Sequence, residues 1–240
     1  MLSALAGSAG CASTSPPSAA TPASDPARTA ATSDDLLSRG GASLFVVHLM
    51  SDFDAFKKYF EEGTAARTKA GIQGHLLSRL DDGRVVVHLF ADDAAKVEQE
   101  LASPELEKYL DRKGSPESSL VWVTQNELVK APRTPPTAQT YSLFLKVHVT
   151  DFAALAQGFE RDLPLFAEHD VIAEGLHRST RKDDIAILHF VGTSREKLDA
   201  LPKRPEFIQL LSSAGSKDEL KPLVGIDLLR SRPALAASAQ

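Results

Sequence analysis

The sequence predicts an α+β protein built from one βαββαβ unit that occurs twice in tandem. The stretch ASLFVVHLMSDF at residues 42–53 recurs as YSLFLKVHVTDF at residues 141–152. A stretch with three prolines, residues 130–140, stands between the two copies and favours an extended linker. Matches that return at a nearly constant separation are the sequence signature of an internal repeat.

The similarity between the two copies extends along their whole length. Asp52 and Asp151 are 99 positions apart (151 − 52), and Leu120 and Leu223 are 103 apart (223 − 120). Because the separation changes so little, we interpret the pattern as a tandem duplication. The predicted divisions are a tether at 1–41, repeat one at 42–129, the linker at 130–140, repeat two at 141–230 and a tail at 231–240.

Each repeat begins with a strand and a capped helix. Residues 43–50 and 142–149 are rich in the β-branched and aromatic side chains that strands prefer. Asp52 and Asp151 follow where a carboxylate accepts amide hydrogens of the first helical turn. Apolar residues then recur at helical spacing, and Gly71 suits the left-handed end of the first helix.

The remaining elements complete the unit. In repeat one they are strands at about 72–80 and 85–91, a helix at about 92–112 and a strand at 119–127. Asp81-Asp82-Gly83 is a hairpin signal between the first two strands. Repeat two ends in a strand at 223–229. The order βαββαβ favours a ferredoxin-like sheet.

Such a unit leaves one face of its sheet uncovered, because both helices pack on the other face. A repeat this short also buries little surface by itself. Two repeats that meet through their open faces solve both problems. We therefore predict a single-chain, pseudo-dimeric α/β barrel with a lumen between the two sheets.

The start of repeat one resembles a known superfamily. Asp52-Phe53-Asp54-Ala55-Phe56-Lys57, followed by Phe60, is similar to a DFDAWK-then-F pattern of dimeric α/β-barrel proteins. These are relatives of antibiotic-biosynthesis monooxygenases, and Ser103-Pro104-Glu105-Leu106 resembles the same group. The shared residues form a cap, a core face and a helix restart, so the resemblance implies a fold more than a chemistry.

Composition and motifs exclude several functions. A formal charge of −5 and a pI near 5.8 argue against a nucleic-acid groove, which needs a basic face. One cysteine, Cys11, allows no intrachain disulfide and no thiolate zinc cluster. The sequence has no phosphate-binding glycine loop, GxSxG elbow or HExxH motif, and we predict no metal and no cofactor.

The N-terminal residues 1–41 suggest an address in the bacterial cell envelope. Ser8-Ala9-Gly10-Cys11 resembles a lipobox, in which the cysteine is acylated and anchors the chain to a membrane. The following Ala, Ser, Thr and Pro residues form a tether that lacks large apolar groups. The alternative is a cytoplasmic protein with a disordered N-terminus and an incidental Cys11.

A candidate ligand site lies in repeat two. On strand 142–149, Lys146 and His148 alternate with an apolar row and should face the lumen with Phe144. A four-residue turn at 180–183 places Glu174 opposite His189, with Arg178 on the same face. The five candidate residues are Lys146, His148, Glu174, Arg178 and His189, and the ligand would be small, anionic and partly apolar. The alternative to a binding site is that these polar side chains form a solvated rim of the barrel, with histidines that make ordinary hydrogen bonds.

The copies differ at these positions. Repeat one carries Val47, Leu49 and Leu89 where repeat two carries Lys146, His148 and His189, and His75 replaces Glu174. The polar groups therefore collect on one half of the predicted lumen.

Three functions remain open. The first is an envelope-tethered small-ligand-binding or structural module without catalysis, which this sequence favours. The second is a cofactor-independent monooxygenase or cyclase, as the resemblance implies, although Trp122 is better explained as a packing residue. The third is a haem-binding tandem barrel, for which no local motif is present. The sequence does not predict the oligomeric state.

Overall fold

The computed structural model describes residues 36–37, 41–49, 52–102, 104, 120–130, 139–216 and 219–231. The predicted tether, linker and C-terminal tail lie almost wholly outside these residues, as does Cys11. None of the described helices is long and apolar enough to cross a membrane.

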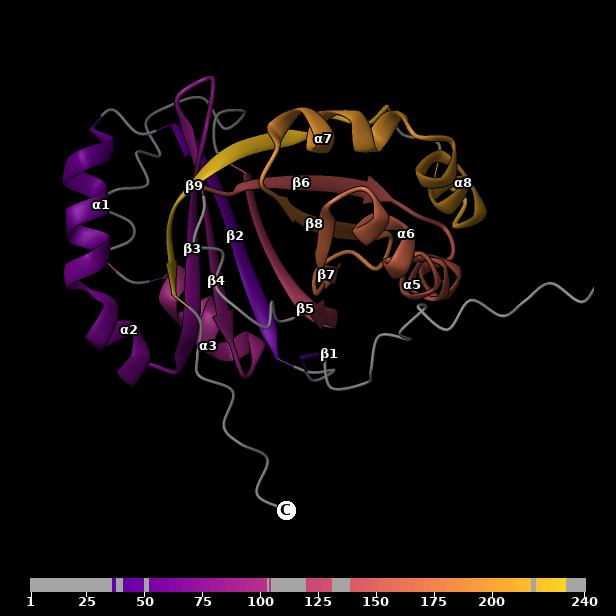
Figure 1. Ribbon diagram of the computed structural model, residues 1–240. Helices are drawn as coiled ribbons and strands as arrows, with labels where there is room; N and C mark the ends of the chain where they lie inside the picture. Colours follow the sequence, from indigo (N-terminus) through magenta and orange to yellow (C-terminus); the bar gives the residue numbers. More distant parts are fainter. Residues whose placement is uncertain are drawn as a thin grey trace, which may run out of the picture. The chain divides into compact units, whose positions relative to one another are not determined.

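The elements follow the predicted order in both halves (Figure 1). The first half contains β2 (Ala42–Leu49), α1 (Phe53–Glu62), α2 (Thr64–Lys69), β3 (Ile72–Leu80), β4 (Arg84–Ala91), α3 (Ala94–Leu101) and β5 (Leu120–Lys130), preceded by the short β1 (Leu36–Leu37). The second contains β6 (Tyr141–His148), α5 (Phe152–Arg161), α6 (Leu163–Glu168), β7 (Val171–Ser179), β8 (Ile185–Gly192), α7 (Arg195–Ala200), η3 (Leu201–Lys203), α8 (Pro205–Ser213) and β9 (Leu223–Ser231).

The predicted helix caps are confirmed. Asp52 Oδ1 accepts a hydrogen bond from the Ala55 amide at 3.0 Å, and Asp151 Oδ1 accepts one from the Ala154 amide at 2.9 Å. Gly71 has φ +94°, the left-handed conformation expected at the end of a helix. The helix between Asp52 and Gly71 is not continuous, however, because it breaks into α1 and α2 at Gly63.

The strands form one antiparallel sheet. Its order within the first half is β5-β2-β4-β3, and within the second half β9-β6-β8-β7. Strand β3 pairs with β9 and strand β5 pairs with β7, so each of these eight strands pairs with two others of the eight. The pairings therefore run in a closed cycle that joins the two halves at both ends.

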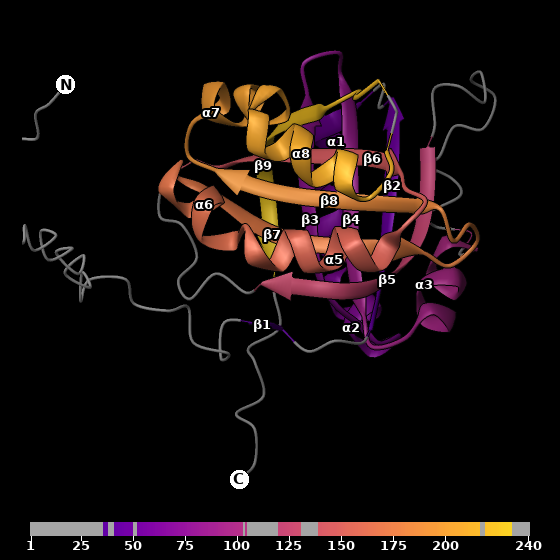
Figure 2. The ribbon, with the colours of Figure 1, turned by 90° about the vertical axis from the view of Figure 1, so that its right-hand side faces the viewer.

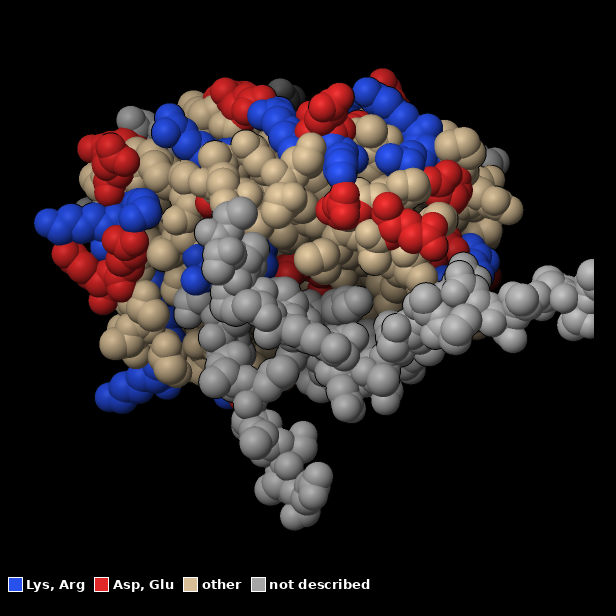
Figure 3. All heavy atoms as spheres, viewed as in Figure 1, with Lys and Arg blue, Asp and Glu red and all other residues tan. Residues whose placement is uncertain are grey.

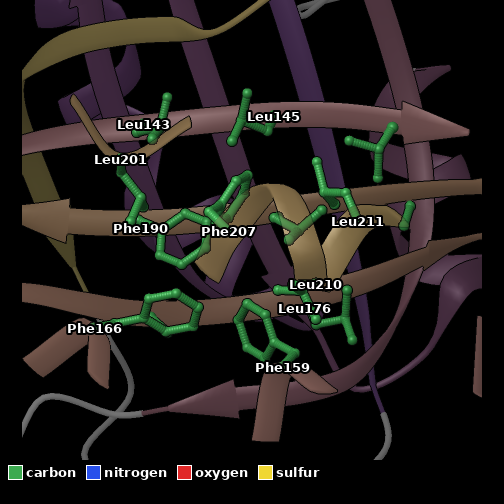
Figure 4. Packing of buried hydrophobic residues seen from close by; sticks show 14 of the residues in the cluster. Leu143, Leu145, Phe159, Phe166, Leu176, Phe190, Leu201, Phe207, Leu210 and Leu211 are labelled. Atoms are coloured by element: carbon green, nitrogen blue, oxygen red, sulfur yellow. The ribbon is translucent and has the colours of Figure 1, made fainter. Parts of the chain in front are cut away.

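The helices bury one face of each half (Figures 1 and 2). In the second half, the predicted apolar row packs beneath the helices. It consists of Leu143, Leu145 and Val147 of β6 and of Val149, which directly follows the strand. Figure 4 shows Phe159, Phe166 and Phe207 from three helical segments meeting the strands that carry Leu143, Leu176 and Phe190. Burial of this apolar face is the main contribution to the stability of the half.

The opposite face is buried between the halves. A separate apolar cluster contains Phe45 and Val86 from the first half together with Phe144 and Ile187 from the second. Trp122 packs against this cluster, which supports its interpretation as a packing residue.

Two equivalent pairs of rings lie in this interior. Phe45 is directly opposite His88, and Phe144 is directly opposite His189. The ring centroids are 3.9 Å apart in the first pair and 4.5 Å apart in the second, and both pairs are stacked. His88, rather than Leu89, is therefore the counterpart of His189, which corrects the sequence alignment by one residue.

Lys and Arg side chains are intermixed with Asp and Glu on the face shown in Figure 3. Two ion pairs of this kind join the halves. Asp81 Oδ1 is 2.5 Å from Arg195 Nη1, and Glu98 Oε2 is 2.8 Å from Arg181 Nη2.

Candidate active site

The centre of the site is a bulge in β7. Ala173 pairs with Phe190 and Gly175 pairs with His189, so Glu174 is the extra residue between them. The predicted pairing of Glu174 with His189 is therefore wrong by one residue. The bulge nevertheless keeps the two side chains together, because Glu174 Oε2 lies 3.7 Å from His189 Nδ1 and both side chains are buried.

The bulge also changes the face on which later residues of β7 lie. Leu176 packs with the helix-side cluster, and the Arg178 guanidinium lies 5.0 Å from the centroid of the Phe152 ring in α5. Period-two alternation places Arg178 on the same face as Glu174 only if no residue is inserted between them. Arg178 therefore lies outside the interior that holds Glu174.

Lys146 and His148 do not join this group either. Lys146 is exposed to solvent, and the half-exposed His148 has its Nδ1 3.5 Å from Asp184 Oδ2. Of the five residues predicted from the sequence, the structure thus brings together Glu174 and His189.

Arg230 and Asp227 of β9 complete the cluster, and the sequence reasoning missed both. Arg230 Nη1 donates to Glu174 Oε1 at 3.1 Å, and Arg230 Nη2 donates to Asp227 Oδ2 at 3.4 Å. A shift in the β3–β9 register between Leu77 and Ser78 accompanies this arrangement. Because the missed residues are three apart on a strand, simple alternation assigns them to opposite faces.

Asp227 is held by neutral donors as well as by Arg230. Ser78 Oγ donates to Asp227 Oδ1 at 2.7 Å, and Thr140 Oγ1 donates to Asp227 Oδ2 at 2.9 Å. On the other side of Glu174, His189 Nε2 is 3.2 Å from Ser142 Oγ. A continuous polar network therefore runs from Ser142 to Ser78.

This network meets a pocket of about 350 Å³. Glu174, Arg230 and Thr140 supply polar atoms to its lining, and Val171, Ile172 and Val191 supply apolar ones. A cavity of this size with a few convergent polar groups is typical of a small-molecule site. We call this region the charged end.

The equivalent position between β5 and β7 is neutral. His177 is paired with Asn126, as Ser78 is paired with Asp227. Asn126 Oδ1 accepts hydrogen bonds from Ser43 Oγ and from His177 Nδ1, each at 2.8 Å. Since a carbonyl oxygen only accepts, the Nδ1 of His177 carries the hydrogen. We call this region the neutral end.

Burial decides the charge of His177. Its side chain has no exposed surface, and burial lowers the pKa of His177 from 6.5 to about 3. The imidazole is therefore neutral at any ordinary pH, and the neutral end carries no formal charge.

The charged end has the groups needed for proton transfer beside an apolar cavity. A carboxylate can accept a proton from a bound molecule, and a neighbouring guanidinium can stabilise the anion that results. Within the described part of the chain, no three His, Cys, Asp or Glu side chains are arranged to hold a metal ion.

Solved structures share this fold. A proposed monooxygenase from Fusobacterium nucleatum has a TM-score of 0.59 at 10% identity, over 81% of this chain and 96% of its own. An anthrone oxidase-like protein has a TM-score of 0.54 at 14% identity, over 85% and 99%. A proposed monooxygenase from Lactobacillus acidophilus has a TM-score of 0.51 at 12% identity, over 79% and 94%. No family model and no curated protein matches the sequence.

These likenesses confirm the predicted α+β fold. They also correct the function that the sequence favoured. The prediction of a non-catalytic envelope module is wrong in the light of these neighbours, which are named as monooxygenases and as an oxidase-like protein. The monooxygenase alternative agrees better with them.

Proposed function

We propose that the two halves are tandem ferredoxin-like repeats that close into a single-chain, pseudo-dimeric barrel. The equal strand order of the halves and the closed cycle of pairings support this. Small details repeat as well. The Arg79 guanidinium lies 5.4 Å from the centroid of the Phe53 ring, and the Arg178 guanidinium lies 5.0 Å from the centroid of the Phe152 ring. The two arginines are 99 positions apart in the sequence (178 − 79), and so are the two phenylalanines (152 − 53).

We propose further that the protein is an oxygen-dependent monooxygenase or oxidase that acts without a cofactor on an activated methylene group. The observation that supports this most is the contact of Glu174 and Arg230 at the pocket. The likeness to an anthrone oxidase-like protein suggests the kind of substrate. Anthrone has an acidic methylene group next to aromatic rings and a carbonyl.

The residues of the charged end would act in three ways. Glu174 would take a proton from the methylene carbon, and Arg230 would stabilise the resulting enolate oxygen. His189 lies behind Glu174, 3.7 Å from its Oε2, and would share the proton.

The reaction balances with O₂ as the oxidant. The carbanion adds O₂ to form a peroxide, and loss of the second methylene hydrogen with cleavage of the O–O bond gives a carbonyl and hydroxide. Hydroxide takes up the proton stored on Glu174. One methylene group and one O₂ thus give one carbonyl and one water.

An oxygen electrode tests the proposal. With anthrone and EDTA, the protein should consume O₂ and form anthraquinone at equal rates, and E174Q should lower kcat by roughly 100-fold or more. H75Q alters the residue that the sequence aligns with Glu174, and should leave kcat within about threefold of the wild-type value, a change below 1 kcal/mol. Anthrone oxidation no faster than without protein would contradict the proposal.

Haem does not fit the charged end, because haem iron needs an axial protein ligand. The described lining of the pocket there contains no His, Cys, Met or Tyr.

The lipid anchor at Cys11 remains a proposal, because it lies outside the described residues. It rests on the sequence Ser8-Ala9-Gly10-Cys11 alone. Cells that express the wild type should incorporate a radioactive fatty acid into the protein, and cells that express C11S should not. Equal labelling of the two proteins, or of neither, would contradict the anchor.

A further inference from the structure

We infer that Ser78, a residue of the first half, is a positioning residue for the active site of the second half. The inference rests on the proposed function and deepens it. Ser78 touches neither the pocket nor Glu174 in any contact the structure describes, so it acts through Asp227 and Arg230.

The first link is the hydrogen bond from Ser78 Oγ to Asp227 Oδ1, at 2.7 Å. Ser78 is fully buried and Asp227 is nearly so. The two residues are directly opposite each other on β3 and β9, one of the two places where the halves join. A buried hydroxyl on a rigid strand fixes the carboxylate that it binds more firmly than water would.

The second link is Asp227 itself. Its Oδ2 receives Thr140 Oγ1 at 2.9 Å and Arg230 Nη2 at 3.4 Å, and its backbone amide donates to the Thr140 carbonyl at 2.9 Å. The contact with Arg230 is the longest of these. Rotation of the carboxylate after loss of the Ser78 bond would therefore act first on Arg230.

The third link is Arg230. Its Nη1 donates to Glu174 at 3.1 Å while its Nη2 faces Asp227, so two carboxylates hold the guanidinium from two directions. This fixes the plane of the guanidinium beside the pocket. The enolate of the proposed reaction needs that donor in place before it forms.

Two other titratable groups near Glu174 do not replace this arrangement. His189 faces Glu174 from β8, on the side away from Asp227. Asp170, the residue before β7, lines the same pocket but forms an ion pair with Lys197 of α7. Besides Glu174 itself, Asp227 is therefore the carboxylate that orients Arg230, and Ser78 orients Asp227.

The neutral end provides a matched control. Ser43 Oγ donates to Asn126 Oδ1 at 2.8 Å, so S43A removes a buried hydroxyl from the amide that is equivalent to Asp227. S78A and S43A delete the same group from equally buried strand positions. Any effect seen only in S78A therefore belongs to the link with Arg230.

The test measures the side chain of Arg230 by ¹⁵N NMR in the full-length protein. In the wild type, the two Nη groups of Arg230 should give separate signals, because both are held. S78A should broaden or merge them, whereas S78T, which keeps the hydroxyl, and S43A should preserve them. With anthrone, S78A should lower kcat roughly tenfold with KM changed less than about twofold, and S78T should restore kcat.

Two outcomes separate the inference from the proposed function. If the folded S78A protein keeps wild-type Nη signals and wild-type kcat, Ser78 is not a positioning residue. If the Nη signals behave as expected and wild-type protein does not oxidise anthrone, the positioning of Arg230 by Ser78 stands and the proposed reaction is wrong.

Discussion

The charged end and the neutral end occupy equivalent places in the two halves and solve the same packing problem differently. At the neutral end, Asn126 satisfies Ser43 and His177 with one carbonyl oxygen. At the charged end, Asp227 stands in the position of Asn126 and binds Ser78, Thr140 and Arg230. Both are opposite a residue of the adjoining half.

The neutral end shows that the fold does not need charge at this place. The neutral end closes the same kind of strand pair with hydrogen bonds between uncharged groups. Burying a carboxylate and a guanidinium requires their desolvation, which often offsets the attraction between them. We therefore attribute the charges of the charged end to the binding and chemistry proposed above, whereas the neutral end shows what the structure alone requires.

The largest expected effect comes from removing the cation. R230A leaves Glu174 and Asp227 buried without their shared partner, and should lower the free energy of unfolding by about 3–5 kcal/mol. N126A at the neutral end should lower it by about 1–3 kcal/mol, because only uncharged groups lose a partner. Urea denaturation measures both. Equal losses would mean that the two ends do not differ in the way described.

A second prediction concerns acid. Burial lowers the pKa of His177 to about 3 and, with Arg67 nearby, that of His75 to about 4. Because the unfolded state binds protons below pH 6.5 and these folded imidazoles do not, stability is fully present above pH 6.5 and falls below it. Each histidine contributes a slope of about 1.4 kcal/mol per pH unit. Urea titrations between pH 7 and pH 4.5 measure it.

H177Q isolates the contribution of the neutral end to this slope. Gln keeps a donor for Asn126 and does not titrate in this range. The variant should lose the part of the pH dependence that belongs to His177 and keep that of His75. An unchanged slope would show that His177 is not responsible.

The two stacked ring pairs should respond alike. F45L and F144L each remove a ring that is stacked on a histidine. The ring centroids of Phe45 and His88 are 3.9 Å apart, and those of Phe144 and His189 are 4.5 Å apart. Each should cost about 1–1.5 kcal/mol of stability. Thermal or urea unfolding of the two variants measures the match. A difference above about 1 kcal/mol would argue against equivalent roles in the two halves.

The smallest effects are expected at the ion pairs between the halves. In the first pair, Asp81 of the turn between β3 and β4 binds Arg195. In the second pair, Glu98 of α3 binds Arg181. Both pairs are partly exposed, so double-mutant cycles should give the smallest coupling energies of this series, and these should shrink in high salt. A coupling as large as the loss caused by N126A would show that these surface contacts, rather than the interior, hold the halves together.

The alternation of side chains in strands, the helical spacing of apolar residues and the helix caps predicted much of the fold, because most of its strands and helices are uninterrupted. Asp52 and Asp151 cap their helices, and the apolar row that begins at Leu143 lies beneath α5 and α8 as expected. The site was harder to predict because it is built at interruptions. One inserted residue at Glu174 moves Arg178 to the other face.

One signal in the sequence could have indicated the bulge in β7. Gly175 stands inside an otherwise regular strand, and isolated glycines there often mark bulges. A Cβ at that position would lie 2.4 Å from His177 Nε2, so the close approach needs a glycine. Arg230 and Asp227 gave no such signal, because Glu174, Ser78 and Thr140, which also bind them, are far from them in the sequence.

The most direct test of the account is where anthrone binds. In a methyl NMR titration under nitrogen, where oxidation cannot proceed, the signals of Ile172, Val171 and Val191 at the charged end should shift with anthrone concentration. Ala42 and Val123, near the neutral end, should not shift. Shifts confined to Ala42 and Val123, or no shift at any concentration that anthrone reaches, would contradict the claim that the charged end is the active site.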